Sequence, residues 1–503
     1  MSVRQGTKRH GAVLLLITIM TASYQSGSGQ SGTVGRFEGR TDIGAPERKG
    51  SAEYDAAESR YLVTGGGENM WGSGDAFHFV WSLVAGDLDL TADIAIKSAA
   101  GNPHRKAGWM VRQSLDPDSP YADAVVHADG LISLQYRLKA GGPTFEAQAA
   151  VRAPAAIKLQ RDGDVFTLSV SRGSGFFQPA ASVSVALKDP VYAGLAVCAH
   201  DAGASASASF ARVKLESHEV IPGRDRVLES TLETIDAASG ERKVVLRLMD
   251  HFEAPNWSRD GKSLLYNSKG RLFTVPVSGG PPREIDTGFA VRCNNDHGYS
   301  PDGKWLAISH SPEKRSLIYI LPAQGGTPRL VTPIGPSYWH GWSPDGLRLA
   351  YCAERGGNYD IYTIPVAGGE EHRLTQAPGL DDGPDYSPDG SHIYFNSERS
   401  GLMQIWRMGA DGSSQEQVTN DPEWADWFPH PSPDGRFLAF ISYDKTVKGH
   451  PANKDVCLRL MPTTGGKPRT LTTLFGGQGT INVPSWSPDS RQFAFVSYRL
   501  VQP

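Results

Sequence analysis

Histidines and aspartates recur in the second half of this 503-residue chain at similar positions before a repeated serine. His251, His297, His340, Asp382 and His430 each precede such a serine by two to seven residues. Imidazole and carboxylate groups that meet at one point can hold a divalent metal or carry out acid–base chemistry. In the simpler alternative, they bond only to loops and water. Either reading requires a fold that brings the repeats together.

The repeated serine opens the motif Ser-Pro-Asp-Gly, which predicts a tight turn between two strands. Two more strands follow in each full copy, which makes four antiparallel strands per repeat. Successive serines are 42, 43, 44, 45 and 55 residues apart, and a period of about 40–45 residues is typical of propeller blades. The six serines are Ser258, Ser300, Ser343, Ser387, Ser432 and Ser487.

The final repeat stops after two strands, and the missing pair occurs upstream as residues 230–248. We therefore expect six blades, the last of them completed by segments from both ends of the region. Such closure removes the open sheet edge that would invite aggregation.

Residues just before each serine should enter the innermost strand and meet at one opening of the channel. His297 and His340 occupy the same position in adjacent repeats. The insertion at residues 443–455 is expected to be a surface loop, and the glycine-rich segment 474–482 to shape the opening. The predicted ligand-binding residues are His251, Asp296, His297, Trp339, His340, Asp382, Trp427, His430 and Asn482. The candidates for a divalent metal are His297, His340 and His430.

The repeats resemble the TolB-type, WD40-like repeat family over residues 226–498. This resemblance implies a periplasmic propeller that binds partner proteins. Similar repeats occur in prolyl peptidases and in some polysaccharide lyases, whose propellers use a His-ligated metal at this place, although their ligand motifs do not align convincingly here. A prolyl peptidase is excluded, because the sequence contains no Gly-x-Ser-x-Gly nucleophile motif.

The first 23 residues combine a basic start, an apolar run of about ten residues and small residues, which predicts a secretory signal peptide. Residues 24–32 are expected to be a flexible leader. The formal charge of -4 and the absence of a basic block argue against nucleic-acid binding. We expect a periplasmic or secreted protein with no membrane span after cleavage. The four scattered cysteines are expected to be buried thiols.

Residues 33–217 have no repeats but many short alternating strands, which predicts a β-sandwich, and residues 218–503 form the propeller region. The strand order resembles a concanavalin-A-like jelly roll found in secreted glycan-active proteins. Polar and aromatic residues along the strands would either hold a sugar or belong to the core and the solvated face. They are His78, Trp81, His104, Arg105, Lys106, Arg112, Gln113, His127, Tyr136 and Arg137.

The whole chain is thus predicted to be all-β, a sandwich followed by a six-bladed propeller. The leading hypothesis for function is an exported binding or scaffold protein whose channel mouth binds a protein, peptide or glycan, with a sandwich that binds a glycan. The alternative is a carbohydrate-active lyase or hydrolase that uses the histidines and aspartates of the mouth, with or without a divalent metal. No complete catalytic set of residues can be named from the sequence, which favours binding.

Overall fold

The computed structural model describes residues 33–97, 101–172, 177–218, 220, 226–313 and 315–501. Within these ranges the chain forms strands and turns and contains no helix. The predicted signal peptide and leader lie outside the described residues. In the described part, no helix is long and apolar enough to cross a membrane.

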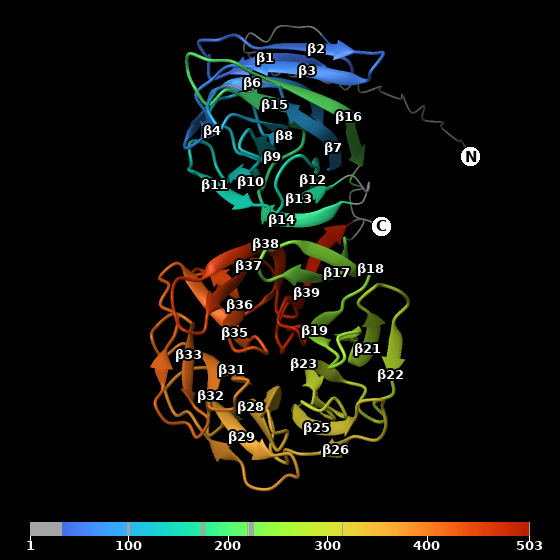
Figure 1. The fold of residues 1–503 in the computed structure, drawn as a ribbon, viewed down its shortest axis with the longest axis vertical. Coiled ribbons are helices and arrows are strands. Elements are labelled where there is room, and N and C mark those ends of the chain that lie inside the picture. The colour runs from blue at the N-terminus through green and yellow to red at the C-terminus, as the bar shows by residue number, and fades with distance from the viewer. Residues whose placement is uncertain are drawn as a thin grey trace, which may run out of the picture.

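The first domain is a sandwich of two seven-stranded antiparallel sheets (Figure 1). With a small hairpin, sixteen strands form this domain. The first sheet, in spatial order, contains β1 (Gly39–Ile43), β6 (Phe77–Val84), β15 (Val191–Cys198), β8 (Lys106–Arg112), β9 (Tyr121–His127), β10 (Ile132–Arg137) and β11 (Thr144–Gln148). The second contains β14 (Gln178–Ser184), β13 (Val165–Ser171), β12 (Ala156–Asp162), β7 (Asp87–Ile96), β16 (Ala206–His218), β3 (Arg60–Gly65) and β2 (Ser51–Asp55). A small hairpin pairs β4 (Met70–Trp71) with β5 (Gly74–Asp75).

One large apolar core joins the facing sides of the two sheets. It includes Trp109, Leu134, Leu159 and Phe210, all fully buried. The inward residues alternate with outward ones along each strand, as the period of two predicts.

The second domain is the predicted six-bladed propeller (Figure 1). Blade 1 contains β19 (Glu253–Trp257), β20 (Ser263–Ser268), β21 (Arg271–Pro276) and β22 (Arg283–Ile285). Blade 2 contains β23 (Cys293–Tyr299), β24 (Trp305–His310), β25 (Leu317–Pro322) and β26 (Arg329–Leu330). Blade 3 contains β27 (Ser337–Trp342), β28 (Arg348–Arg355), β29 (Asn358–Pro365) and β30 (His372–Arg373).

Blade 4 contains β31 (Asp381–Tyr386), β32 (His392–Ser397), β33 (Gln404–Gly409) and β34 (Glu416–Gln417). Blade 5 contains β35 (Trp424–Pro431), β36 (Phe437–Asp444), β37 (Ala452–Pro462) and β38 (Arg469–Gly477). The closing blade contains β18 (Arg242–Leu248), β17 (Val227–Asp236) and β39 (Gln492–Val501).

The closing blade confirms the predicted sharing between the two ends of the region. β17 pairs antiparallel with β39 over ten residues, from Val227 opposite Val501 to Asp236 opposite Gln492. A bridge between Trp486 and Phe493 adds the innermost segment of this blade. Inside the blade, Arg242 and Glu233 form a buried ion pair with a 2.6 Å contact.

The turns at the six repeated serines are built alike, although the first reads Ser-Arg-Asp-Gly and the last Ser-Pro-Asp-Ser. In blade 2, Ser300 Oγ donates to Asp302 Oδ1 at 2.6 Å, and the same Asp oxygen accepts the Lys304 N–H at 3.1 Å. Ser300 Oγ also accepts the Trp305 N–H at 3.0 Å. The six Ser–Asp bonds measure 2.5–2.7 Å. Each turn thus carries its own hydrogen bonds and fixes where the innermost strand ends.

Aromatic residues just before the serines join neighbouring blades. Trp342 Nε1 donates to Gly298 O in blade 2 at 3.2 Å, and Trp486 Nε1 donates to His430 O in blade 5 at 2.9 Å. Trp339 of β27 lies so close to Gly298 that a Cβ there would be 2.3 Å from its ring. Only glycine fits at position 298 without a shift of that ring.

The sandwich sits against the closing blade and blade 5, with β14 beside β38 and β18 (Figure 1). Asp162 of β12 accepts a charged hydrogen bond from Arg499 of β39 at 2.9 Å, and Asp87 pairs with Arg226 at 2.9 Å. Ser184 donates through N and Oγ to Asp455 of blade 5. The sandwich therefore braces the strands that close the ring.

We predict that a chain beginning at Arg226 folds as a propeller, whereas one beginning at Asp250 does not. The longer chain keeps β17, but the shorter one leaves β39 without its partner and exposes a sheet edge. The longer chain should melt below the propeller of the full chain, since Arg226 and Arg499 lose Asp87 and Asp162. Circular dichroism and thermal unfolding check both expectations. Equal melting of the two truncated chains would contradict the closure argument.

Candidate functional site

The six innermost strands enter the channel at one opening and end at the Ser-Pro-Asp-Gly turns around the other. At the entry side lies a cavity of about 360 Å³, here called the mouth. Its lining comes from blades 2 to 5 and from the segment before the closing strand. The lining residues are Asn294, Asn295, Asp296, Tyr338, His340, Cys352, Tyr359, Leu380, Asp382, Phe428, His450, Gln478 and Asn482.

The charged centre of the mouth is a pair between His340 of β27 and Asp382 of β31, with Nε2 and Oδ1 3.1 Å apart. Burial disfavours the imidazolium, but the Asp382 carboxylate outweighs this and raises the pKa of His340 to about 9. Burial likewise opposes the Asp382 charge, yet His340 lowers the pKa of this carboxyl to about 2. Both groups are therefore ionised at neutral pH.

Asp296 of β23 is a second carboxyl in the mouth. Its burial, reinforced by the Asp382 charge, raises the pKa of Asp296 to about 6 despite the nearby His340. Asn294 Nδ2 donates to Asp296 Oδ2 at 2.6 Å and orients it. Near it, burial and then the Asp296 charge raise the pKa of Glu253 to about 7. The mouth thus contains more carboxyl groups than cations.

His450 enters the mouth from the insertion between β36 and β37. Its Nε2 lies 3.8 Å from Asp382 Oδ2, and its ring contacts Trp427 and Phe428 with centroids 4.5 and 5.1 Å apart. His450 lies within residues 443–455, which were predicted to form a surface loop, and it was not among the predicted ligand-binding residues. The extra length of the last repeat spacing was the only signal that this segment differs from its counterparts.

Four of the nine predicted ligand-binding residues line the mouth together: Asp296, His340, Asp382 and Asn482. Tyr359, Phe428 and Gln478 also line the mouth but were not among the predicted residues, although Gln478 lies in the glycine-rich segment expected to shape the opening. Tyr359 lies on the third strand of its blade. The prediction considered only positions just before each repeated serine, so it could not include this residue.

The other predicted residues lie elsewhere. His297 is fully buried, and burial lowers its pKa to about 4, although backbone groups of Asn294 and Ala254 oppose this shift. His430 is buried against Asp385, with Nδ1 3.1 Å from Oδ2. Trp339 lines the opposite opening, and Trp427 packs behind His450. His251 is half-exposed and stacks on Tyr498 at 5.6 Å.

The three histidines named as metal candidates are not gathered into a ligand set. Among the described residues, the only three potential ligands within 4.8 Å of one another are Asp89, Glu216 and His218 of the sandwich. Asp89 already pairs with Lys158 at 2.8 Å. The arrangement of the mouth suits hydrogen bonding and charge pairing with a ligand.

Many polar residues considered for sugar binding in the sandwich bond to the chain itself. Arg112 and Arg137 both pair with the buried Asp75 of the β4–β5 hairpin. Lys106 Nζ donates to Gln135 Oε1 at 3.0 Å and to Met70 O at 3.4 Å. The small hairpin thus covers part of this face of the first sheet.

Comparisons with known proteins concern the propeller. A family model described as the TolB beta propeller domain matches residues 335–473. The uncharacterized protein Atu1656 of Agrobacterium fabrum is 54% identical over 273 residues, which are 54% of this chain and 93% of that protein. Because about half of this chain spans nearly all of that relative, the rest has no counterpart in it.

Two solved structures are similar as well. One, from Agrobacterium tumefaciens and assigned as a TolB, is 53% identical, covers 55% of this chain and 99% of its own, and has a TM-score of 0.53. TolB from Acinetobacter baumannii is 19% identical, covers 63% of this chain and 81% of its own, and has a TM-score of 0.39.

The His340–Asp382 pair predicts a specific pH dependence of stability. Because the pKa of folded His340, about 9, exceeds the usual 6.5, its protonation stabilises the fold fully below pH 6.5, and this is lost as pH rises through about 9. The full effect is ~3 kcal/mol. Urea unfolding of the wild type and His340→Gln should give a difference that shrinks over this interval. A constant difference from pH 6 to 9.5 would contradict the pairing.

Proposed function

The chain belongs to the family of TolB-like β-propeller proteins, and on that premise we propose that it is an exported binding protein. Its mouth holds a segment of a partner protein or peptide, and its sandwich holds a glycan. The observation that carries the proposal is the mouth, a cavity of about 360 Å³ with aromatic, amide and charged groups in place. Propellers of this family commonly bind proteins, which supports a protein ligand.

The size of the mouth limits what enters it. Ligand sites of small molecules measure about 300–1,000 Å³. A cavity of about 360 Å³ therefore accepts one long side chain or one chain terminus, and the rest of a partner would lie across the surrounding loops. Tyr338, Tyr359 and Phe428 supply apolar wall, while Asn482 and Gln478 supply donors and acceptors.

The charges of the mouth favour a basic group on the ligand. His340 is neutralised by Asp382, so Asp296 remains as a carboxyl without a cation of its own. An ammonium or guanidinium group placed beside it would favour its ionised form, lower its pKa below 6 and gain a charge-assisted hydrogen bond. We therefore expect a lysine, an arginine or a terminal amine to enter the mouth.

The site of action follows from two features. The first 23 residues have the pattern of a secretory signal peptide, and the TolB-like family is usually periplasmic. We accordingly place the protein in the periplasm or outside the cell.

A peptide library displayed against the full chain tests the mouth. Selected peptides should share a basic residue, and Asp296→Asn should weaken the best of them at least tenfold, about 1.4 kcal/mol, by calorimetry at pH 7.5. Asp118→Asn, an exposed change on the sandwich, is the matched control and should leave the affinity unaltered. Peptides without a basic residue, or an affinity unaffected by Asp296→Asn, would count against the proposal.

A second candidate, a carbohydrate-active lyase or hydrolase, is favoured by one observation. Asp296, with a pKa raised to about 6, can donate or accept a proton near neutral pH beside the His340–Asp382 pair. Incubation with neutral and acidic polysaccharides, followed by measurement of reducing ends and of unsaturated uronates, tests it. Activity that Asp296→Asn abolishes would replace binding with catalysis as the function of the mouth.

A further inference from the structure

Three adjoining hollows cross the outer face of the second sheet of the sandwich. The first, of about 400 Å³, lies over β2 and β3, and the second, of about 530 Å³, lies over the central strands. The third, of about 220 Å³, lies at the junction with the propeller. The first two share Arg60 and Ser209, and the last two share Ser171 and Arg172. Neighbouring hollows thus share side chains, and the three lie in a row that we call the groove.

The strand register explains the course of the groove. One row of directly paired residues runs across six neighbouring strands on this face. In order from β2 to β13 the row is Asp55, Arg60, Ala211, Asp93, Ala156 and Ser171. Five strand spacings of ~4.8 Å give the row a length of ~24 Å. The groove thus runs across the strands and is long enough for an extended chain.

Small residues make the floor of the groove and charged residues make its walls. The short side chains of Ala95, Ala156 and Ser209 line the second hollow, and that of Ala95 is exposed to solvent. On one wall Arg212 pairs with Asp93 at 2.5 Å. Among the residues that the structure describes, Ser171 Oγ has no hydrogen-bond partner. Its side chain is 4% exposed and belongs to both of the last two hollows. A buried hydroxyl of this kind is ready to bond a ligand.

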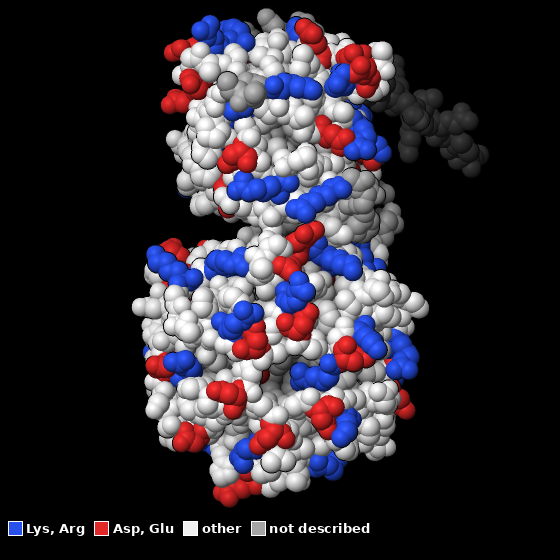
Figure 2. All heavy atoms as spheres, in the orientation of Figure 1, with Lys and Arg blue, Asp and Glu red and all other residues white. Residues whose placement is uncertain are grey.

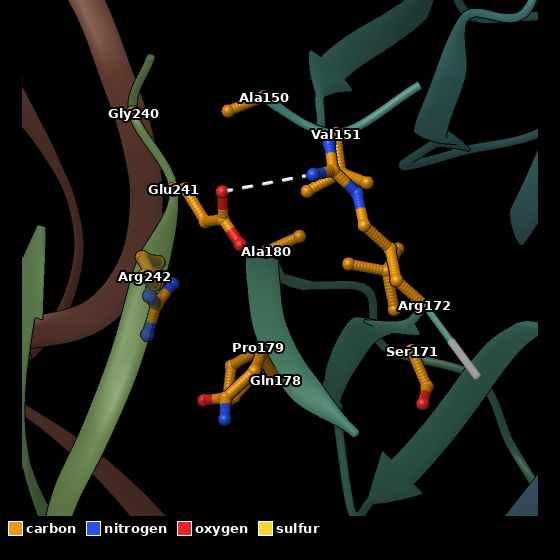
Figure 3. A pocket seen from close by; sticks show the side chains of 11 residues that line it. Ala150, Val151, Ser171, Arg172, Gln178, Pro179, Ala180, Gly240, Glu241 and Arg242 are labelled. Carbon is orange, nitrogen blue, oxygen red and sulfur yellow. Dashed lines mark ion pairs between the residues drawn. The ribbon is translucent and has the colours of Figure 1, made fainter. Parts of the chain in front are cut away.

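The propeller completes the far end of the groove. Figure 3 shows Arg172 of the sandwich facing Glu241 of the closing blade, with the start of β14 between them, and their closest atoms are 3.9 Å apart. Both side chains are more than half exposed, so this contact contributes little to stability by itself. It leaves a guanidinium and a carboxylate available on opposite sides of the third hollow.

We propose that this groove binds a linear, uncharged glycan chain that runs across the sandwich and ends against the propeller. The inference rests on the proposed function, because it names the surface and the class of the glycan that the sandwich holds. The hydroxyl groups of a sugar both donate and accept hydrogen bonds. They therefore suit walls on which guanidinium, carboxylate and serine groups alternate.

Two other classes of ligand fit less well. A peptide that adds a strand needs the free main-chain groups of a sheet edge, but the groove crosses six paired strands. A polyanion needs an excess of positive charge. The groove has five basic and four acidic side chains, and one of the basic ones, Arg242, is already paired with Glu233.

The test begins with an array of neutral and charged oligosaccharides probed with the full chain. The best neutral oligosaccharide is then titrated by calorimetry against Ala95→Trp, which fills the floor, and Arg172→Ala, which removes one wall. Both positions are exposed, so folding should persist. We expect Ala95→Trp to weaken binding at least tenfold and Arg172→Ala severalfold. Ala202→Trp, on an exposed loop away from the groove, should leave it unchanged.

Each outcome separates the groove from the wider function. If a glycan binds but neither Ala95→Trp nor Arg172→Ala weakens it, the groove is wrong while the protein remains a glycan-binding protein. Binding of charged sugars alone overturns the neutral class. If the array is empty, both the groove and the glycan role fall, whereas the peptide experiment on the mouth still decides the other half of the function.

Discussion

The pairing of β17 with β39 is the contact on which the rest of the propeller depends. Ten residues of one strand meet ten of the other, and the pairing converts an open row of blades into a ring. Only in a ring do Asp296, His340, Asp382 and Asn482, which come from different blades, line one cavity. The sandwich reinforces this contact, because Asp87 and Asp162 bind Arg226 and Arg499 at the end of the paired strands where Val227 faces Val501. Assembly of the mouth and docking of the sandwich are therefore linked through one blade.

The charged groups of the mouth are buried, whereas most of those of the groove are exposed to solvent. In the mouth, burial moves the pKa values of Asp296 and Glu253 upward, and the one close ion pair keeps His340 and Asp382 charged. On the sandwich face the charged groups are exposed and of both signs. Figure 2 shows the same mixture over the visible face of both domains, where Lys and Arg are interspersed with Asp and Glu. Long-range steering by a field of one sign is not a property of that surface.

Periodic features of the fold were predictable from the sequence, and non-periodic ones were not. The six serine turns and the shared closing blade were predicted because the repeats occur at a nearly fixed spacing, which also shows where one repeat is incomplete. Position relative to Ser343 placed His340 correctly, but it could not separate it from Trp339, the preceding residue, which lines the opposite opening. His430 was predicted from its position before Ser432 in the same way. In the structure it instead pairs with Asp385 inside the channel wall. His450 was not predicted, because the insertion that contains it has no counterpart in the other repeats. The groove of the sandwich was not predicted either, because it depends on the register between strands, which a sequence without repeats does not reveal.

The shared closing blade also has a consequence for biosynthesis. During translation β17 leaves the ribosome before any complete blade, and β39 emerges only after all five of them. The sandwich, made earlier, can fold first, so Asp87 and Asp162 are in position before their arginines arrive. Until β39 emerges, β17 has one unpaired edge, and for that interval the nascent chain depends on the sandwich, or on a chaperone, to keep that edge from other strands.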